Sequence, residues 1–463
     1  MELSTLTLTL KPHWENGTVA WTHIAFSFPA HALPEKPEIR YADKGFGGII
    51  PFPEYDEFYL SDDRGDLAYT LIDSPNSMRN GTVLFKDILF EREAYGTVRW
   101  GYRALPRVLP ENYRSSPYFD FRSEPNGMNG IGFFSFMLPK AGTKFHASVH
   151  WDMSEMPEGA RGVFWCAADD FEIDTDTMEF MMGYYAVGLM NAVEDQSFGV
   201  YWFGETSFDA AALAAKLSAL FHVFAEFFHD KNAVYRIFLR RDPFEASGGG
   251  TAGTRSFISG YSATGDVDME QWYATLAHEI LHNWPEMNDD NYGEGTWYNE
   301  GCAEYYSTLL PLRAGLTKPE YAAKQINDKV AFRYLDNPYR EVSNMDIAEV
   351  QWKDRRAQTV PYGRGCLYLA NTDAELKRLN KGSIDDFISI HNKYNPITEE
   401  DWTAFIRERL GEDGIQKFEN MKAGNLFAPA PDAFDGQFDC QAVDVEIDGK
   451  HAKSYRWTVR KSE

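Results

Sequence analysis

Residues 278–282 read His-Glu-Ile-Leu-His, and these residue types at this spacing suit the binding of a metal ion. Side chains four residues apart lie on one face of a helix, so the imidazoles of His278 and His282 can hold the same zinc ion. Glu279 is rotated by about 100° around the helix axis, because an α-helix has 3.6 residues per turn. Its carboxylate can therefore face a water at the ion without binding the ion itself. The pattern predicts metal-assisted hydrolysis with Glu279 as the general base.

A second acidic segment, residues 297–306, follows and predicts another short helix that begins near Glu300. Glu300 can supply the third ligand, which completes a site of two histidines and one glutamate for a single zinc ion. Glu304 lies one turn further along the same face, where its carboxylate can accept the second ring N–H of a ligand histidine. The alternatives are an ordinary surface helix with two histidines and a solvated acidic face. The presence of both segments in one chain favours the metal site.

An apolar stripe supports the helix that carries the two histidines. Apolar residues recur with helical spacing between Met269 and Trp284. Asp268 followed three residues later by Gln271 predicts a capping pair at the start of this helix, and Pro285 predicts its end.

Residues 278–284 and 297–306 resemble the signature of the gluzincin metallopeptidases, in particular the M61 glycyl aminopeptidase family and the related M1 aminopeptidases. The 17 residues between His282 and Glu300 are one fewer than the usual M1 spacing, which favours M61. The resemblance implies a zinc-dependent peptidase that acts on a peptide or protein substrate.

Residues 360–365, Val-Pro-Tyr-Gly-Arg-Gly, are similar to a V-P-Y-x-K-G segment of the M1 enzymes. The tyrosine of that segment helps to stabilise the tetrahedral intermediate. The resemblance therefore implies the same role for Tyr362.

One segment departs from the family pattern. The aminopeptidases of these families usually carry a glycine-rich strand that ends in a glutamate, which holds the α-amine of the substrate. The corresponding stretch here contains Gly248, Gly249 and Gly250, which the resemblance implies as substrate-binding residues, but Ala252 or a neighbour replaces the glutamate and Arg255 follows. A zinc endopeptidase or a specialised processing enzyme therefore remains an alternative to an aminopeptidase. A non-catalytic peptide-binding scaffold is a second alternative.

The order of predicted elements indicates an α+β multidomain protein. Residues 1–205 read as short strands separated by turn signals, with one such strand expected at 132–137, and predict an N-terminal antiparallel β domain. The resemblance implies a thermolysin-like zinc catalytic domain at 206–325 and a helical domain at 326–432 that completes the active site. Residues 433–463 are expected to form a short appendage.

Composition limits the classes of partner. The chain has 70 acidic and 45 basic residues, a net charge of −25, which opposes nucleic-acid binding. No apolar run approaches the roughly 20 residues that span a bilayer, so we expect no membrane partner. The first residues lack the features of a signal peptide, and four scattered cysteines indicate neither a disulfide framework nor a cysteine metal site. We therefore expect a cytoplasmic protein, whose oligomeric state the sequence leaves open.

A second histidine pattern needs a separate interpretation. His222, Glu226 and His229 lie at helical spacing and could form another metal site. Aromatic residues are interleaved with them, so ordinary packing of an amphipathic helix is the favoured interpretation.

Overall fold

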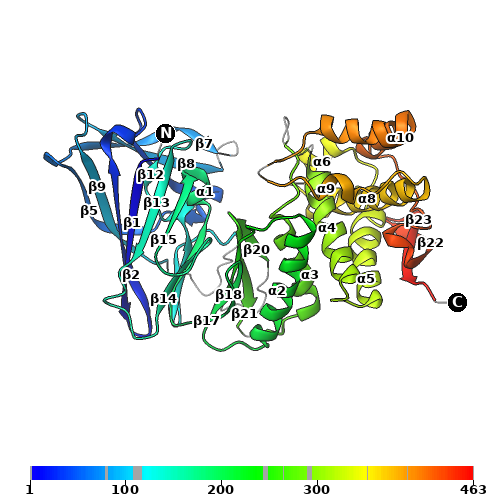
Figure 1. The fold of residues 1–463 in the computed structure, drawn as a ribbon, viewed down its shortest axis with the longest axis horizontal. Coiled ribbons are helices and arrows are strands. Elements are labelled where there is room, and N and C mark those ends of the chain that lie inside the picture. The colour runs from blue at the N-terminus through cyan, green and yellow to red at the C-terminus, as the bar shows by residue number, and fades with distance from the viewer. Residues whose placement is uncertain are drawn as a thin grey trace. The chain divides into compact units, whose positions relative to one another are not determined.

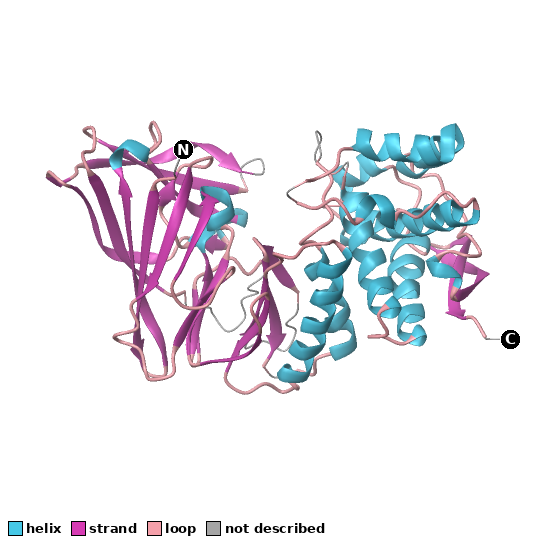
Figure 2. Cartoon of the chain, viewed as in Figure 1, coloured by secondary structure: helices cyan, strands magenta, loops and turns pink. Residues whose placement is uncertain are grey.

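The computed structural model describes residues 3–78, 82–107, 117–242, 249–263, 265–288, 293, 295–351, 353–393 and 395–461. The chain forms two compact units. Unit 1 comprises Met1–Ala214 and Val234–Val267, and unit 2 comprises Ala215–Ala233 and Asp268–Glu463. Unit 1 is rich in antiparallel strands and unit 2 is mainly helical (Figures 1 and 2), which confirms the predicted α+β class. The predicted division into four domains stays a prediction.

The strand that opens the largest sheet of unit 1 alternates buried and more exposed side chains along its length. In β1 (Thr5–Glu15), Leu6, Leu8 and Leu10 are fully buried while their neighbours are partly exposed. The strand pairs antiparallel with β2 (Thr18–Pro29) and parallel with β13 (Lys144–Trp151). The seven strands follow the order β15 (Phe171–Asp176), β13 (Lys144–Trp151), β1, β2, β9 (Thr97–Leu105), β5 (Glu54–Asp62), β6 (Gly65–Asp66).

Two smaller sheets complete the N-terminal part of unit 1. One has the order β10 (Arg122–Glu124), β11 (Gly127–Ile131), β16 (Tyr184–Gly188), β14 (Arg161–Phe164). The other has the order β12 (Leu138–Pro139), β3 (Ile39–Gly45), β8 (Val83–Phe90), β7 (Tyr69–Met78), with β4 (Ile50–Pro51) paired to β3. The short helices of this part are η1 (Ala30–Ala32), η2 (Phe46–Gly48), η3 (Gly132–Phe134) and α1 (Thr177–Met181).

The strand predicted at 132–137 is wrong at its start, because η3 is a 3-10 helix. The amide groups of Ser135 and Phe136 both donate to the carbonyl of Gly132, at 3.1 and 2.8 Å. A Cβ atom on Gly132 would lie 2.7 Å from the ring of Phe136, so this tight turn depends on a glycine.

The last sheet of unit 1 is mixed, with the order β17 (Met190–Glu194), β18 (Phe198–Phe203), β19 (Tyr235–Asp242), β21 (Ser256–Ser262), β20 (Gly250–Gly253). The three central strands are parallel and the two edge strands are antiparallel. Every residue of β18 and β21 is buried. Burial of every residue is typical of central parallel strands, which are covered on both faces.

Unit 1 also buries a network of charged side chains. Arg240 is fully buried, pairs with the carboxylate of Asp120 and donates from Nε to Asn129 Oδ1 at 2.6 Å. Arg122 donates to Asp242 Oδ1 at 2.9 Å. Each of the two arginines therefore faces a buried carboxylate.

The elements of unit 2 are mostly helices. They are, in chain order, α3 (Met269–Leu281), α4 (Thr296–Arg313), α5 (Pro319–Ile326), the π-helix η4 (Asn327–Leu335), α6 (Asn344–Val350), α7 (Arg355–Gln358), α8 (Val360–Arg378), α9 (Asp385–Ile388), α10 (Glu399–Lys422) and η5 (Phe434–Gly436). The hairpin β22 (Phe438–Ile447) and β23 (Lys450–Val459) follows. α2 (Ala210–Phe227) begins in unit 1 and continues into unit 2. By length and composition α2 could span a membrane, although 39% of it is buried in the protein.

Helices α4 and α8 approach each other so closely that only glycine fits between them. A Cβ atom on Gly365 would lie 1.9 Å from the carbonyl oxygen of Trp297, and one on Gly301 would lie 2.7 Å from the Cα of Gly365. Because Gly301 directly follows Glu300 and Gly365 lies three residues after Tyr362, this packing fixes two candidate site residues relative to each other.

Candidate metal centre

The predicted ligand side chains come together in unit 2. Asp268 caps α3 by accepting from the amide groups of Glu270 and Gln271, at 3.1 and 3.0 Å, and the helix ends with His282 as its C-cap. His278 Nε2 lies 3.0 Å from His282 Nε2 and 3.1 Å from Glu300 Oε2 on α4.

His282 Nε2 lies 3.3 Å from Glu300 Oε2, which closes a triangle of donor atoms. Among the described residues, His278, His282 and Glu300 form the only group of three histidine, cysteine or acidic side chains that could hold a metal ion. We call these three side chains the metal cluster.

The donor atoms fit a tetrahedral zinc ion. Ligand atoms bound at 2.0–2.1 Å to tetrahedral zinc lie about 3.3 Å apart. The separations of 3.0, 3.1 and 3.3 Å agree with that value. Three protein ligands leave the fourth position open, as in catalytic rather than structural zinc sites.

The charges around the cluster favour a bound cation. Burial lowers the pKa of His278, but the Glu304 carboxylate and hydrogen bonds to Glu300 and Glu304 outweigh this effect and raise it to about 10. Burial raises the pKa of Glu300, but His282 and His278 outweigh this and hold it well below its usual range. A histidine binds a metal ion in its neutral form, so a metal ion that binds here would compete with protons for the same nitrogen atoms.

Glu304 lies behind the cluster. Its Oε1 is 3.5 Å from His278 Nδ1, on the side of the ring away from the other donor atoms. Burial raises the pKa of Glu304, but Lys329 and then His278 outweigh this and hold it well below its usual range. Lys329, whose Nζ is 2.7 Å from Glu304 Oε2, was not predicted from the sequence, where no motif marks it.

The two residues predicted to do chemistry flank the cluster. Burial is the main cause that raises the pKa of Glu279, which would favour its uptake of a proton. The ring of Tyr362 stacks on that of His278, with centroids 5.6 Å apart and an angle of 9°. Burial first, and then the charges of Glu300 and Glu279, raise the pKa of Tyr362 well above its usual range, so its hydroxyl remains a hydrogen-bond donor.

The glycines predicted to bind substrate belong to another part of the chain. Gly248 lies outside the described residues, Gly249 has φ +92°, and Gly250 begins β20 in unit 1. A Cβ atom on Gly250 would lie 2.1 Å from the ring of Phe257, so packing alone requires a glycine there. Their role in substrate binding stays a prediction.

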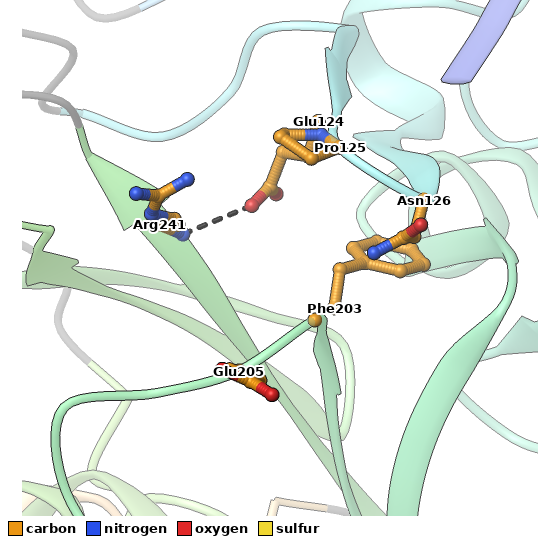
Figure 3. Close-up of a pocket in the computed structure, with 7 residues that line it drawn as sticks. Glu124, Pro125, Asn126, Phe203, Glu205 and Arg241 are labelled. Carbon is orange, nitrogen blue, oxygen red and sulfur yellow. Dashed lines mark hydrogen bonds between the residues drawn. The ribbon is translucent and has the colours of Figure 1, made fainter. Parts of the chain in front are cut away.

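A separate pocket of about 320 Å³ in unit 1 lies at the turn after β10 and at the ends of β18 and β19 (Figure 3). Glu124, Asn126, Phe203, Glu205 and Arg241 line it. Glu124 Oε2 accepts from the backbone amide of Arg241 at 2.9 Å. None of the predicted site residues lines this pocket, so it is distinct from the metal cluster.

Residues 271–364 match the model of the M61 glycyl aminopeptidase family. These residues include both segments of the metal cluster and Tyr362. A comparison with curated proteins gives no match.

Solved structures share the fold. An aminopeptidase N family protein from Idiomarina loihiensis is 11% identical, with a TM-score of 0.67, over 95% of this chain and 79% of that one. An M1 zinc metallopeptidase variant from Deinococcus radiodurans, bound to a Tyr-Ser-Ala substrate, is 13% identical, with a TM-score of 0.52, over 93% and 96%. Native leukotriene A4 hydrolase from Saccharomyces cerevisiae is 13% identical, with a TM-score of 0.50, over 94% and 69%.

The family match covers the segments that converge on the metal cluster, and the fold matches extend over nearly the whole chain. The chain is thus similar to the M61 glycyl aminopeptidases over residues 271–364, and it shares its fold with M1 metallopeptidases.

Proposed function

We propose that the chain hydrolyses peptide bonds at one zinc ion held by His278, His282 and Glu300. The observation that carries the proposal is the triangle of three donor atoms, 3.0–3.3 Å apart. The match of residues 271–364 to an aminopeptidase family supports an aminopeptidase-like reaction.

Zinc, when bound, supplies a Lewis acid that polarises the scissile carbonyl and lowers the pKa of water. Glu279 accepts the proton of the attacking water and then returns it to the nitrogen of the leaving amine. Its raised pKa suits both steps, because a base that binds the proton too weakly cannot carry it to the amine. Tyr362 donates a hydrogen bond to the carbonyl oxygen as negative charge develops there. Glu304 orients the ring of His278 from its far side.

One observation favours endopeptidase activity as the second candidate. The edge strand β20 reads Gly-Thr-Ala-Gly and carries no carboxylate. A cationic N-terminus needs an acidic partner when it leaves water. An enzyme without that partner in this strand would cut within peptides or act on one dedicated substrate.

The test is mass-spectrometric mapping of a peptide library with free and acetylated N-termini, digested by the zinc-loaded protein beside Glu279→Gln. Stepwise loss of N-terminal residues from free peptides alone would establish an aminopeptidase. Internal cuts that do not depend on acetylation would establish the endopeptidase. Cleavage no greater than that of Glu279→Gln would contradict both and favour a peptide-binding scaffold.

A further inference from the structure

A π-helix of nine residues, η4 (Asn327–Leu335), carries Lys329, whose Nζ lies 2.7 Å from Glu304 Oε2 behind the metal cluster. Well under 1% of residues in proteins adopt this conformation, usually as a single turn within an α-helix and frequently at functional sites. A nine-residue π-helix therefore requires a physical reason.

Lys329 on η4 ends at the carboxylate behind the cluster. Its side chain is only 5% exposed, and its Nζ lies 2.7 Å from Glu304 Oε2. It also donates to Ser307 Oγ at 3.0 Å and to Thr308 Oγ1 at 3.1 Å. Three side chains of α4 thus hold the ammonium group of Lys329 in a fixed place. Arg333, four residues later on the π-helix, brings a second cation to 3.9 Å from Glu304 Oε1.

The two oxygens of Glu304 have different partners. Oε2 faces Lys329, and Oε1 faces His278 Nδ1 at 3.5 Å. A carboxylate held on one oxygen cannot rotate freely about its last bond, so the other oxygen keeps its direction toward the imidazole. We propose that Lys329 is a positioning residue for the metal cluster, which acts through Glu304 to orient His278.

The surroundings of η4 support this role. A Cβ atom on Gly363 would lie 2.5 Å from the carbonyl oxygen of Lys329, so η4 also sets the place of the residue after Tyr362. Asn327, the first residue of η4, donates to the carbonyl of Trp457 at 2.7 Å and accepts from its amide at 2.9 Å. The C-terminal hairpin therefore braces the π-helix that carries Lys329.

The inference rests on the proposed function, and zinc affinity tests it without any peptide. The experiment titrates the metal-free full chain with zinc against a competing chelator and records the absorption spectrum of the cobalt-substituted protein. Lys329→Met should bind zinc about 10–100-fold more weakly than the wild type, which is the usual effect of losing a residue that orients a metal ligand. The absorption spectrum of its cobalt-substituted form should also shift. Lys324→Met is the matched control, because Lys324 is 62% exposed and pairs with Glu270 at 2.5 Å.

A double-mutant cycle separates positioning from general damage to the fold. If Lys329 acts through Glu304, Lys329→Met should add no loss of zinc affinity in a Glu304→Gln background. Additive losses, or wild-type affinity and spectrum in folded Lys329→Met, would overturn the inference.

Should Lys329→Met not fold, the double variant, which removes both buried charges, is compared with Glu304→Gln alone. Equal affinity supports the inference and a further tenfold loss contradicts it. Two other outcomes would instead refute the proposed function. The wild-type chain could bind no zinc, or the His282→Ala variant could bind zinc as tightly as the wild type.

Discussion

The molecule buries two clusters of titratable side chains, and they differ in how their charges are matched. In unit 1, Arg240 pairs with Asp120 and Arg122 pairs with Asp242 inside the protein. In unit 2, the atoms that converge are two imidazole nitrogens and one carboxylate oxygen, all of which can accept a proton or a metal ion.

The difference shows that burial and altered pKa values do not by themselves mark a functional site. Both clusters are buried and both shift the pKa values of their members. In the unit 1 network each arginine already has a carboxylate partner, which is the arrangement that buried charges need for stability. In the metal cluster the cation must come from outside. We therefore expect substitutions in the metal cluster to change activity and substitutions in the unit 1 network to change stability.

The largest effect is expected for Glu279→Gln in unit 2. The amide cannot accept the proton of the attacking water, so kcat should fall by about 10⁴-fold, the upper range for general base catalysis. Zinc content, measured by atomic emission, should stay at the wild-type level, because Glu279 is not a ligand in the proposed site. Retained turnover would remove Glu279 from the chemistry and weaken the contrast between the two clusters.

The sequence was sufficient to predict that His278, His282 and Glu300 come together, because the two histidines lie one helical turn apart. His278 and Glu279 lie in α3 and His282 is its C-cap, so the helix ends earlier than the end that Pro285 predicts, and Asp268 caps its start as predicted. The second helix begins at Thr296, earlier than the predicted start near Glu300. The roles assigned to the ligands and to Glu279 and Tyr362 stay predictions that the geometry supports.

Residues that meet across long stretches of sequence were not predicted. Lys329 reaches Glu304 from a π-helix whose sequence, Asn-Asp-Lys-Val-Ala-Phe-Arg-Tyr-Leu, carries no signal that distinguishes it from an α-helix. In unit 1, Arg240 and Asp120 are 120 residues apart. Their pairing depends on the packing of β19 next to the segment before β10, which periodicity cannot show. Among the residues that the structure describes, His222, Glu226 and His229 are not part of a group that could hold a metal ion, and the packing interpretation stays a prediction.

The next largest effect is expected for Arg240→Met in unit 1. The change leaves the buried Asp120 carboxylate without its main partner, which should lower the free energy of unfolding by about 3–5 kcal/mol. Hydrogen exchange followed by mass spectrometry should show faster exchange in β11 and β19. Arg161→Met is the control, because Arg161 pairs with Glu194 where both side chains are partly exposed and should cost about 1 kcal/mol or less. Loss of turnover in folded Arg240→Met protein would contradict a purely structural network.

A smaller effect on activity is expected for Tyr362→Phe. Removal of one oxyanion donor typically lowers kcat by about 10²–10³-fold, which corresponds to about 2.7–4 kcal/mol. The phenylalanine ring can keep the stacking on His278, so zinc affinity and KM should change little. Steady-state kinetics on the peptide identified by the library would check this. A rise in KM with unchanged kcat would place Tyr362 in substrate binding instead.

The smallest effect is a pH dependence with opposite signs at two carboxylates of the unit 1 network. Burial raises the pKa of Asp120, but Arg240 and then Arg122 outweigh this and hold it below its ordinary value of 3.8. The unfolded chain therefore takes up this proton first, and Asp120 contributes stability above pH 3.8 that is lost as the pH falls through the folded pKa. The advantage of the wild type over Asp120→Asn in urea unfolding should shrink by up to about 1.4 kcal/mol per pH unit in that range.

Glu124 should behave in the opposite way, because burial raises its pKa above the ordinary value of 4.5 despite the nearby Arg122 and Arg240. The folded chain binds this proton more tightly than the unfolded chain does. Its contribution is therefore complete below pH 4.5 and is lost as the pH rises through the folded pKa. The free energy of unfolding of Glu124→Gln should gain on that of the wild type as the pH rises. The free energy of unfolding of the two variants, relative to the wild type, could instead change with pH in the same direction and by the same amount. That result would mean that burial alone, and not pairing with arginine, sets the pKa values of Asp120 and Glu124.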